Sequence, residues 1–249
     1  MLTHFTKMNY NIENKINQSV GNNALSFQKK LELNWKAEIV VPSLIYWNLN
    51  DIEIWNQIVF EDFDEKWNLV SAVWLKNFVE TTIHWIPAII IDNHNHALYF
   101  WYKAFCEWII AKEIDLIHID QHSDMNENSN IIDISKEKDL EYIYEFTNYN
   151  TNVWNFIIPA QKSWLINNIF QIRTQYSLEN INEIVWNLEN YILDIDLDFW
   201  APEMYIVDEK LKFEITRKLI KKAKLITIAT SPFFIKQKIA IEILFKILK

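Results

Sequence analysis

The chain has 249 residues, half of them hydrophobic, and a formal net charge of −9, which suits one α/β domain with a sizeable core. It contains no block or stripe of Lys and Arg, so nucleic acid is not an expected partner. No apolar stretch reaches the ~18 residues of a membrane span or forms a secretory leader, so we expect no membrane partner and a cytoplasmic location.

The sequence pattern changes along the chain and predicts two segments. Residues 1–36 are polar and rich in Asn and Lys, and we expect them to form a weakly ordered lead-in. Residues 37–249 are expected to form a single domain. Its first part, up to residue 78, carries short β-type runs at 39–41, 54–60 and 69–74, which predict an N-terminal β-hairpin region.

Runs of Ile, Leu and Val then alternate with helical patterns. Strands are predicted at 86–91, 116–120, 191–198 and 225–229, helices at 94–112, 136–146, 208–222 and 236–248, and further short apolar runs at 157–158 and 169–172. Because strands this apolar are covered on both faces, the alternation predicts an α/β fold of three layers with a mostly parallel central sheet.

Glycine and tryptophan occur in unusual numbers. The chain has one glycine, Gly21, and twelve tryptophans, whereas glycine usually makes up about 7% of a protein. Several tryptophans stand where a turn favours glycine, namely Trp47, Trp67, Trp154 and Trp186. One hypothesis is that their codons are read as glycine in a variant genetic code; the alternative is an Asn-rich, aromatic-rich composition. Trp101 and Trp200 lie in apolar motifs and are expected to be tryptophan.

The most informative motif follows the strand predicted at 116–120. Asp120, His122 and Asp124 alternate there with other residues. In extended backbone they would share one side, and the carboxyl end of a parallel strand is where α/β sheets bind ligands. Two carboxylates and an imidazole suit Mn²⁺, Fe²⁺ or Zn²⁺, so the motif predicts a metal site rather than a plain polar loop.

A second acidic motif lies within the strand predicted at 191–198. Asp194, Asp196 and Asp198 alternate with apolar residues, so they would share a face and repel one another. A bound cation is the simplest compensation, and a solvated edge strand is the alternative.

Two further strand ends carry polar residues. The junction at 89–98 contains His94 and His96, each of which could be a ligand, a catalytic group or a structural histidine. The strand and polar turn at 226–234 could line the same site or be a plain joint between elements.

Together these motifs resemble those of the arginases and related ureohydrolases. Asp120-x-His122-x-Asp124 is similar to their Asp-x-His-x-Asp signature, and Asp196-x-Asp198 with the following Pro202 resembles their Asp-x-Asp-x-x-x-Pro signature. With the runs at 92–97 and 227–234, the set resembles the peptide arginases, which convert arginine side chains of a precursor peptide to ornithine and release urea. The resemblance covers residues 38–248 and implies an arginase/deacetylase-like metallohydrolase domain.

The resemblance also implies a site with two Mn²⁺ ions. Asp120 and Asp196 would bridge the ions, Asp124 and His96 would complete one, and His122 and Asp198 the other. Asp194 and Asp196 could be the ligands in place of Asp196 and Asp198. His96 is preferred to His94 because of the Ala-Leu that follows it, and His94 is then the candidate proton shuttle. Asp194 and Glu203 are candidate partners of the substrate guanidinium.

The chain departs from arginases that act on free arginine. Their long loop after the first motif is missing, and its histidine, a proposed proton shuttle, has no counterpart near residues 152–155. Both differences favour a more open site that takes an arginine-containing peptide. Two alternatives stay open: another C–N hydrolase on the same scaffold, such as a deacetylase-type enzyme, or a metal- or peptide-binding module without turnover. The sequence does not indicate an oligomeric state.

Overall fold

The computed structural model describes residues 10–46, 52–64, 66–185 and 188–248, and a seven-stranded sheet forms its centre. The strands lie in the order β3 (Ser43–Tyr46), β6 (Asn77–Ile83), β7 (Ile86–Ile91), β11 (Leu225–Ala229), β10 (Tyr191–Asp196), β8 (Ile114–Ile119) and β9 (Ile166–Ile172). Neighbours run parallel except for the antiparallel hairpin of β6 and β7. Every residue of β10 and β11 is buried, as the mainly apolar sequences of these strands predict.

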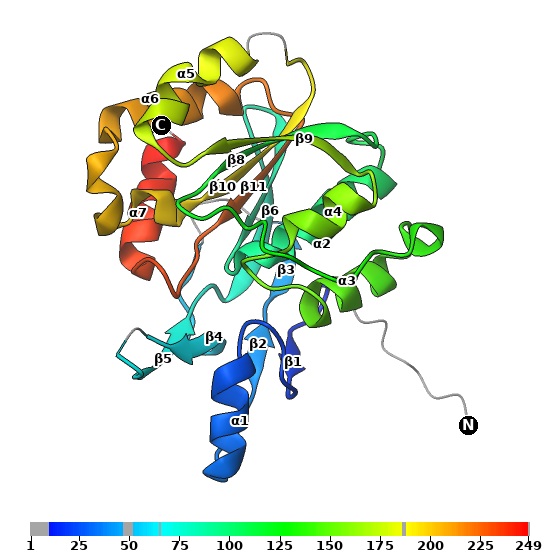
Figure 1. The fold of residues 1–249 in the computed structure, drawn as a ribbon, viewed down its shortest axis with the longest axis vertical. Helices are drawn as coiled ribbons and strands as arrows, with labels where there is room; N and C mark the ends of the chain where they lie inside the picture. The colour runs from blue at the N-terminus through cyan, green and yellow to red at the C-terminus, as the bar shows by residue number, and fades with distance from the viewer. Residues whose placement is uncertain (1–9, 47–51, 65, 186–187, 249) are drawn as a thin grey trace.

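Helices cover the sheet on both sides (Figure 1), which confirms the predicted three-layer α/β fold with a mostly parallel sheet. One side holds α2 (Ala97–Cys106), α3 (Leu140–Tyr149) and α4 (Ile157–Lys162), and the other holds α5 (Gln175–Val185), α6 (Glu209–Ile220) and α7 (Gln237–Ile247). Short 3₁₀ segments η2 (His94–His96), η3 (Ile134–Lys136), η4 (Leu197–Trp200) and η5 (Pro202–Ile206) follow or precede these elements.

The first part of the chain contains more structure than its polar sequence predicts. Strand β1 (Asn14–Ile16) pairs with β2 (Ile39–Val41), and α1 (Ala24–Glu32) lies between them in the sequence. Tyr10, Ile16 and Val20 are buried in the main core, which explains why this stretch is ordered although most of its residues are polar. Residues 1–9 of the expected lead-in lie outside the described residues.

The predicted hairpin region is present as β4 (Ile58–Phe63) paired with β5 (Leu69–Val73). Elsewhere the structure shortens one predicted helix and adds elements that the sequence did not predict. The helix predicted at 94–112 ends at Cys106, the apolar run at 157–158, which was assigned to no element, begins helix α4, and both strand β6 and helix α5 were not predicted. A short apolar run fits a buried helix as well as a strand, and only its tertiary contacts decide between the two.

The parallel arrangement brings several strand ends to the same edge of the sheet. β7, β8 and β10 end at Ile91, Ile119 and Asp196, and β11, which pairs with both β7 and β10, ends at Ala229. The polar residues that follow these strands are therefore neighbours, although they are up to 139 positions apart in the sequence, as in the hydrogen bond from Thr230 to the carbonyl of Ile91.

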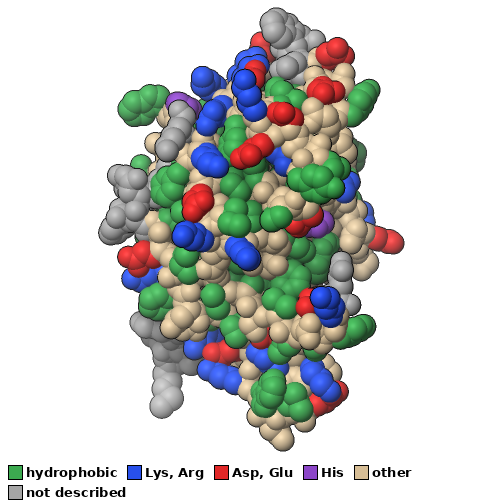
Figure 2. All heavy atoms as spheres, turned by 90° about the vertical axis from the view of Figure 1, so that its left-hand side faces the viewer, with side chains coloured by type: hydrophobic (Ala, Val, Ile, Leu, Met, Phe, Trp, Pro, Cys, Tyr) green, Lys and Arg blue, Asp and Glu red, His purple; other side chains and the backbone are tan. Residues whose placement is uncertain are grey.

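The outer surface is mixed in character. Figure 2 shows acidic and basic side chains interspersed with scattered hydrophobic ones on the face it draws. Among the described residues, no helix has both the length and the apolar character needed to cross a membrane.

A buried lysine holds the chain segment that follows β10. Lys212 of α6 donates from Nζ to the carbonyl oxygens of Phe199 at 2.7 Å and Met204 at 2.9 Å. Its ammonium also lies 4.8 Å from the centre of the Phe199 ring. Burial disfavours the charged form and lowers the pKa of Lys212 to about 8.

The lowered pKa of Lys212 predicts a pH dependence of stability. Unfolded lysine titrates near pH ~10.4, so between pH ~8 and ~10 the unfolded chain binds more protons than the folded one, and stability rises with pH. In Lys212→Met this contribution is absent. We expect the free energy of unfolding of the unsubstituted protein, minus that of the variant, to increase from pH ~8 to ~10, measured by urea unfolding without added metal. A constant difference would contradict the prediction.

Candidate metal centre

The two acidic motifs meet where β8 and β10 end. Asp120 directly follows β8, Asp194 and Asp196 lie on β10, and Asp198 lies in η4. All four are buried, and so is Asp124. Because β8 and β10 are adjacent parallel strands, their C-terminal carboxylates have to share one small volume.

The first motif does not stay extended, yet its three side chains converge. The carboxylate of Asp120 accepts a hydrogen bond of 2.5 Å from the backbone amide of His122, which turns the chain immediately after the strand. Asp124 then adopts a left-handed backbone conformation with φ 52°. That conformation is tolerated by Asp and brings its carboxylate back toward the strand ends, a kind of local strain that is typical of binding sites.

The second motif is divided between a strand and a 3₁₀ turn. Asp194 and Asp196 lie on β10, two positions apart, while Asp198 belongs to η4. Asp196 caps η4 by accepting a hydrogen bond of 2.8 Å from the amide of Asp198, and its other oxygen accepts one from the hydroxyl of Ser231. Ser231 belongs to the turn after β11, for which the sequence left open a place at the site or a plain joint, and it too is left-handed, with φ 41°.

His94 lies in the middle of the carboxylates. Its Nδ1 is 3.2 Å from Asp120 Oδ2, 3.1 Å from Asp124 Oδ2 and 3.2 Å from Asp196 Oδ2. Its side chain is 1% exposed. A histidine this enclosed is placed as a ligand rather than as a shuttle that exchanges protons with solvent, which was its expected role.

His96, the residue preferred as a ligand from the sequence, points elsewhere. Its Nδ1 lies 2.6 Å from the hydroxyl of Tyr10, and its ring packs against Tyr10 and Phe78. The nearest carboxylate to its Nε2 is that of Asp92, at 3.6 Å. In a 3₁₀ segment residues two apart point in different directions, so His94 and His96 cannot both face the strand ends. The geometry therefore favours His94 over His96 as the candidate ligand, and His96 has no contact with the cluster that would make it a proton shuttle.

Sequence reasoning did not select His118, which also belongs to this cluster. It lies within β8, is fully buried, and hydrogen-bonds through Nδ1 to Asp194 Oδ2 at 2.9 Å. Its Nε2 is 3.3 Å from Asp120 Oδ2. The signal available in the sequence was its spacing: His118 and Asp120 are two apart on one strand, so they share a face.

The outer part of the cluster is open to solvent. His122 Nδ1 lies 3.0 Å from Asp198 Oδ2, and the side chain of His122 is 34% exposed. Gln121 Nε2 donates to Asp198 Oδ2 at 3.1 Å and to Glu203 at 3.5 Å. The ring of Phe234 packs 4.8 Å from that of His122. Glu203 is exposed at this opening, whereas Asp194, the other expected substrate partner, is buried beneath the cluster.

The pKa values of the clustered aspartates and histidines are strongly shifted, because burying so many carboxylates together is unfavourable. Burial and the charge of Asp120 raise the pKa of Asp124 to about 7, and burial and the charge of Asp196 raise that of Asp198 well above its usual value. Burial opposes the charged form of His118 and His122, yet hydrogen bonds to the surrounding aspartates raise their pKa values to about 9 and about 10. In the absence of cations, protons therefore have to balance the carboxylates.

The donor atoms fit divalent cations. Ligand atoms lie within 4.8 Å of one another in four groups, namely His94/Asp120/Asp196, His118/Asp120/Asp124, His94/His118/Asp194 and Asp120/His122/Asp198. Asp120 belongs to three of them, so it can be shared between two ions. Mixed imidazole and carboxylate groups suit Mn²⁺, Fe²⁺ and Zn²⁺, and Nε2 of His118 lacks a hydrogen-bond partner.

Comparisons with known proteins add little to this geometry. No protein-family model matches the chain, and no curated protein matches it. Among solved structures, the chain is similar to the arginase of Helicobacter pylori, with 13% identity over 66% of this chain and 71% of that one, and a TM-score of 0.38. A likeness of this degree supports no conclusion about function, so the site is judged by its own residues.

Metal binding can show whether His94 or His96 is the ligand. We expect His94→Asn to weaken binding of Mn²⁺ about 10-fold or more, because it removes a ligand atom from the centre of the cluster. The matched variant His96→Asn should bind Mn²⁺ as the unsubstituted protein does, since His96 contacts none of the grouped carboxylates. Chelator-competition titrations on proteins with verified folding give both constants. Loss of binding in His96→Asn alone would restore the assignment made from the sequence.

Proposed function

We propose that the protein is a metal-dependent hydrolase of the ureohydrolase type that uses two Mn²⁺ ions. Its substrate would be an arginine side chain within a peptide, which it would hydrolyse to ornithine and urea. The observation that carries the proposal is the sharing of Asp120: one buried carboxylate belongs both to the inner groups with His94 and His118 and to the outer group with His122 and Asp198. Two adjacent ions joined by a carboxylate are a recurrent device of hydrolases.

The cluster has separate inner and outer parts, which supports two ions with different surroundings. His94, Asp120, Asp124 and Asp196 would hold the inner ion, and Asp120, His122 and Asp198 the outer one, with Asp196 shared as the resemblance implies. When bound, such a pair supplies Lewis acidity and lowers the pKa of water. Among the grouped residues that the structure describes, His122 alone is partly exposed, so the outer part offers an opening to a substrate.

The residues around the opening suit a guanidinium group on an aliphatic stem. Glu203 offers an exposed carboxylate, and Gln121 links it to Asp198. Beside His122 lies an aromatic cluster made of Phe60, Trp154, Phe233 and Phe234, in which the ring of Phe234 contacts that of His122. A carboxylate can pair with the cation while aromatic faces hold the stem and the charge. That the arginine belongs to a peptide rests on the motif resemblance.

The proposal is tested by incubating the Mn²⁺-loaded protein with arginine-containing peptides and following their mass. Hydrolysis removes CN₂H₂ from each arginine, so a loss of about 42 Da per converted residue is expected, with urea in equal amount. Asp120→Ala should abolish the conversion because it removes the shared ligand, while a peptide with Lys in place of Arg should stay unchanged.

Other outcomes of this experiment separate the alternatives. Release of acetate from acetyl-lysine peptides, without loss of mass from arginine peptides, would replace the proposal by a deacetylase-type activity. Conversion of free arginine but not of arginine-containing peptides would keep the proposed ureohydrolase activity and exclude only the peptide as its substrate. Full metal loading with no hydrolysis of any of these substrates would favour a binding module.

A further inference from the structure

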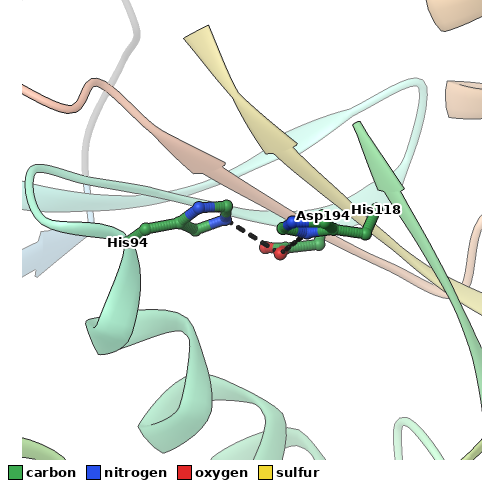
Figure 3. A group of neighbouring side chains, drawn as sticks. All are labelled: His94, His118 and Asp194. Atoms are coloured by element: carbon green, nitrogen blue, oxygen red, sulfur yellow. Dashed lines mark hydrogen bonds and ion pairs between the residues drawn. The ribbon is translucent and has the colours of Figure 1, made fainter. Parts of the chain in front are cut away.

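A row of three polar side chains crosses the sheet beneath the cluster. Asp194 on β10 lies opposite His118 on β8 and opposite Thr227 on β11 in the strand register. Residues opposite one another on parallel neighbours point to the same face, and all three are fully buried. Figure 3 shows the carboxylate of Asp194 joined by dashed lines to both His94 and His118.

Asp194 accepts contacts on both of its oxygens. Oδ2 lies 2.9 Å from His118 Nδ1 and 2.8 Å from His94 Nε2. Oδ1 accepts a hydrogen bond from the hydroxyl of Thr227, which in turn accepts one of 3.2 Å from the indole of Trp101. An indole only donates, so the hydrogen of Thr227 is committed to Asp194, and the carboxylate is fixed as an acceptor.

Because Asp194 acts as an acceptor, it determines which ring nitrogen of His118 and of His94 carries the hydrogen. With the N–H of His118 at Nδ1 and that of His94 at Nε2, a lone pair is left on His118 Nε2 and on His94 Nδ1. His118 Nε2 has no hydrogen-bond partner and lies 3.3 Å from Asp120 Oδ2. A buried lone pair that faces a carboxylate oxygen is unfavourable unless a cation lies between them.

We propose that His118 is a second imidazole ligand of the inner ion, and that Asp194 is the positioning residue that presents both His94 and His118 to it. The inference rests on the metal site of the proposed function but not on its substrate. The inner ion would then have two nitrogen ligands, His94 Nδ1 and His118 Nε2, beside Asp120, Asp124 and Asp196. The rival arrangement is a protonated His118 that bridges Asp120 and Asp194 as an internal ion pair.

A second imidazole changes which ion the site prefers. Imidazole favours Zn²⁺ and Fe²⁺ relative to Mn²⁺, whereas carboxylates suit Mn²⁺. Removal of His118 as a ligand should therefore weaken binding of Zn²⁺ more than binding of Mn²⁺. A protonated His118 would have the opposite effect, because its removal would take a positive charge away from the site.

The test uses His118→Asn, whose amide nitrogen can replace Nδ1 toward Asp194 while no atom replaces Nε2. Relative to the unsubstituted protein, we expect about 10- to 100-fold weaker binding of Zn²⁺, a smaller loss for Mn²⁺, and one fewer nitrogen ligand in pulsed EPR of the Mn²⁺ form. His96→Asn is the matched control, a buried histidine outside the groups. Unchanged nitrogen couplings, or tighter binding, would overturn the proposal.

A milder variant keeps the inference testable if His118→Asn does not fold. Thr227→Val preserves the shape of the side chain but removes the hydrogen bond that fixes Asp194. We expect weaker binding of both ions through loss of positioning, with the nitrogen couplings retained but more heterogeneous. Unchanged affinity and couplings would show that Asp194 does not position the histidines. If the unsubstituted protein binds no divalent ion, the proposed function fails as well; if it binds metal but releases no urea, only the proposed function fails.

An independent observation concerns four exposed tryptophans. Trp67, Trp85, Trp108 and Trp164 have φ values of 60°, 69°, 63° and 63°, and their exposed fractions are 77%, 95%, 82% and 63%. The left-handed region is unfavourable for a bulky side chain and natural for glycine. Gly21, the one glycine of the sequence, is not left-handed; its position is instead crowded, since a Cβ there would lie 2.2 Å from Asn152 Cβ.

The local geometry at three of them, Trp85, Trp108 and Trp164, is that of a glycine position. His84 and Trp85 form the two-residue turn between β6 and β7, both with positive φ, which is the type I′ geometry that prefers glycine second. Trp108 donates to Phe105 and Ile109 to Ala104 after α2; Trp164 donates to Gln161 and Leu165 to Ala160 after α4. Both patterns are Schellman motifs, in which glycine normally occupies the left-handed position.

We infer that glycine is the native residue at 67, 85, 108 and 164, encoded by UGA and read as glycine during natural translation. Trp101, whose indole bonds to Thr227 in the core, is a true tryptophan by the same criterion. Of the other turn positions suspected from the sequence, Trp154 is not left-handed, and Trp47 and Trp186 lie outside the described residues.

This inference is tested by sequencing the codons of the gene and by mass spectrometry of peptides from the natural protein. We expect UGA at the four positions and UGG at Trp101, and peptides lighter by about 129 Da for each glycine in place of tryptophan. Trp85→Gly should also raise the melting temperature of the recombinant chain by about 2–4 °C, and Trp101→Gly should lower it. UGG codons at the four positions, or tryptophan in the natural peptides, would overturn the inference.

Discussion

The constraint on which the rest of the structure depends is the burial of five carboxylates at the ends of two neighbouring strands. Asp120, Asp124, Asp194, Asp196 and Asp198 are each at most 4% exposed, within reach of three histidines. A domain of this size is stable by only about 5–15 kcal/mol, so uncompensated charges in such a place would unfold it. The imidazoles, the backbone amides and bound cations are the available means of compensation.

The sequence predicts this constraint well because both of its causes are local. Continuous runs of Ile, Leu and Val identify buried parallel strands, and carboxylates at their C-terminal ends have to meet at one edge of the sheet. That inference needs no knowledge of strand order. The left-handed turn at Asp124 and the 3₁₀ turn at Asp198 depart from the extended geometry first assumed, yet the side chains still converge, because the strand ends fix where each segment begins.

The identity of the histidines could not be predicted in the same way. His94 and His96 are two positions apart in a 3₁₀ segment, and which one faces the carboxylates depends on a contact with Tyr10, more than 80 positions away. His118 sits inside an apolar strand, two positions before Asp120. Its role depends on the register of β8 with β10, which places Asp194 opposite it and which the sequence does not reveal.

The contact between His96 and Tyr10 also helps to explain why the polar N-terminal segment is ordered. His94 points to the carboxylates while its neighbours point away and are held by the first part of the chain: Asn93 donates to the carbonyl of Val59, Asn95 accepts from Asn22, and His96 contacts Tyr10. Each contact limits how η2 can rotate. The order of the N-terminal segment and the orientation of the His94 side chain therefore depend on the same contacts. Cations bound by His94 would stabilise that segment, although it supplies none of the grouped donors among the described residues.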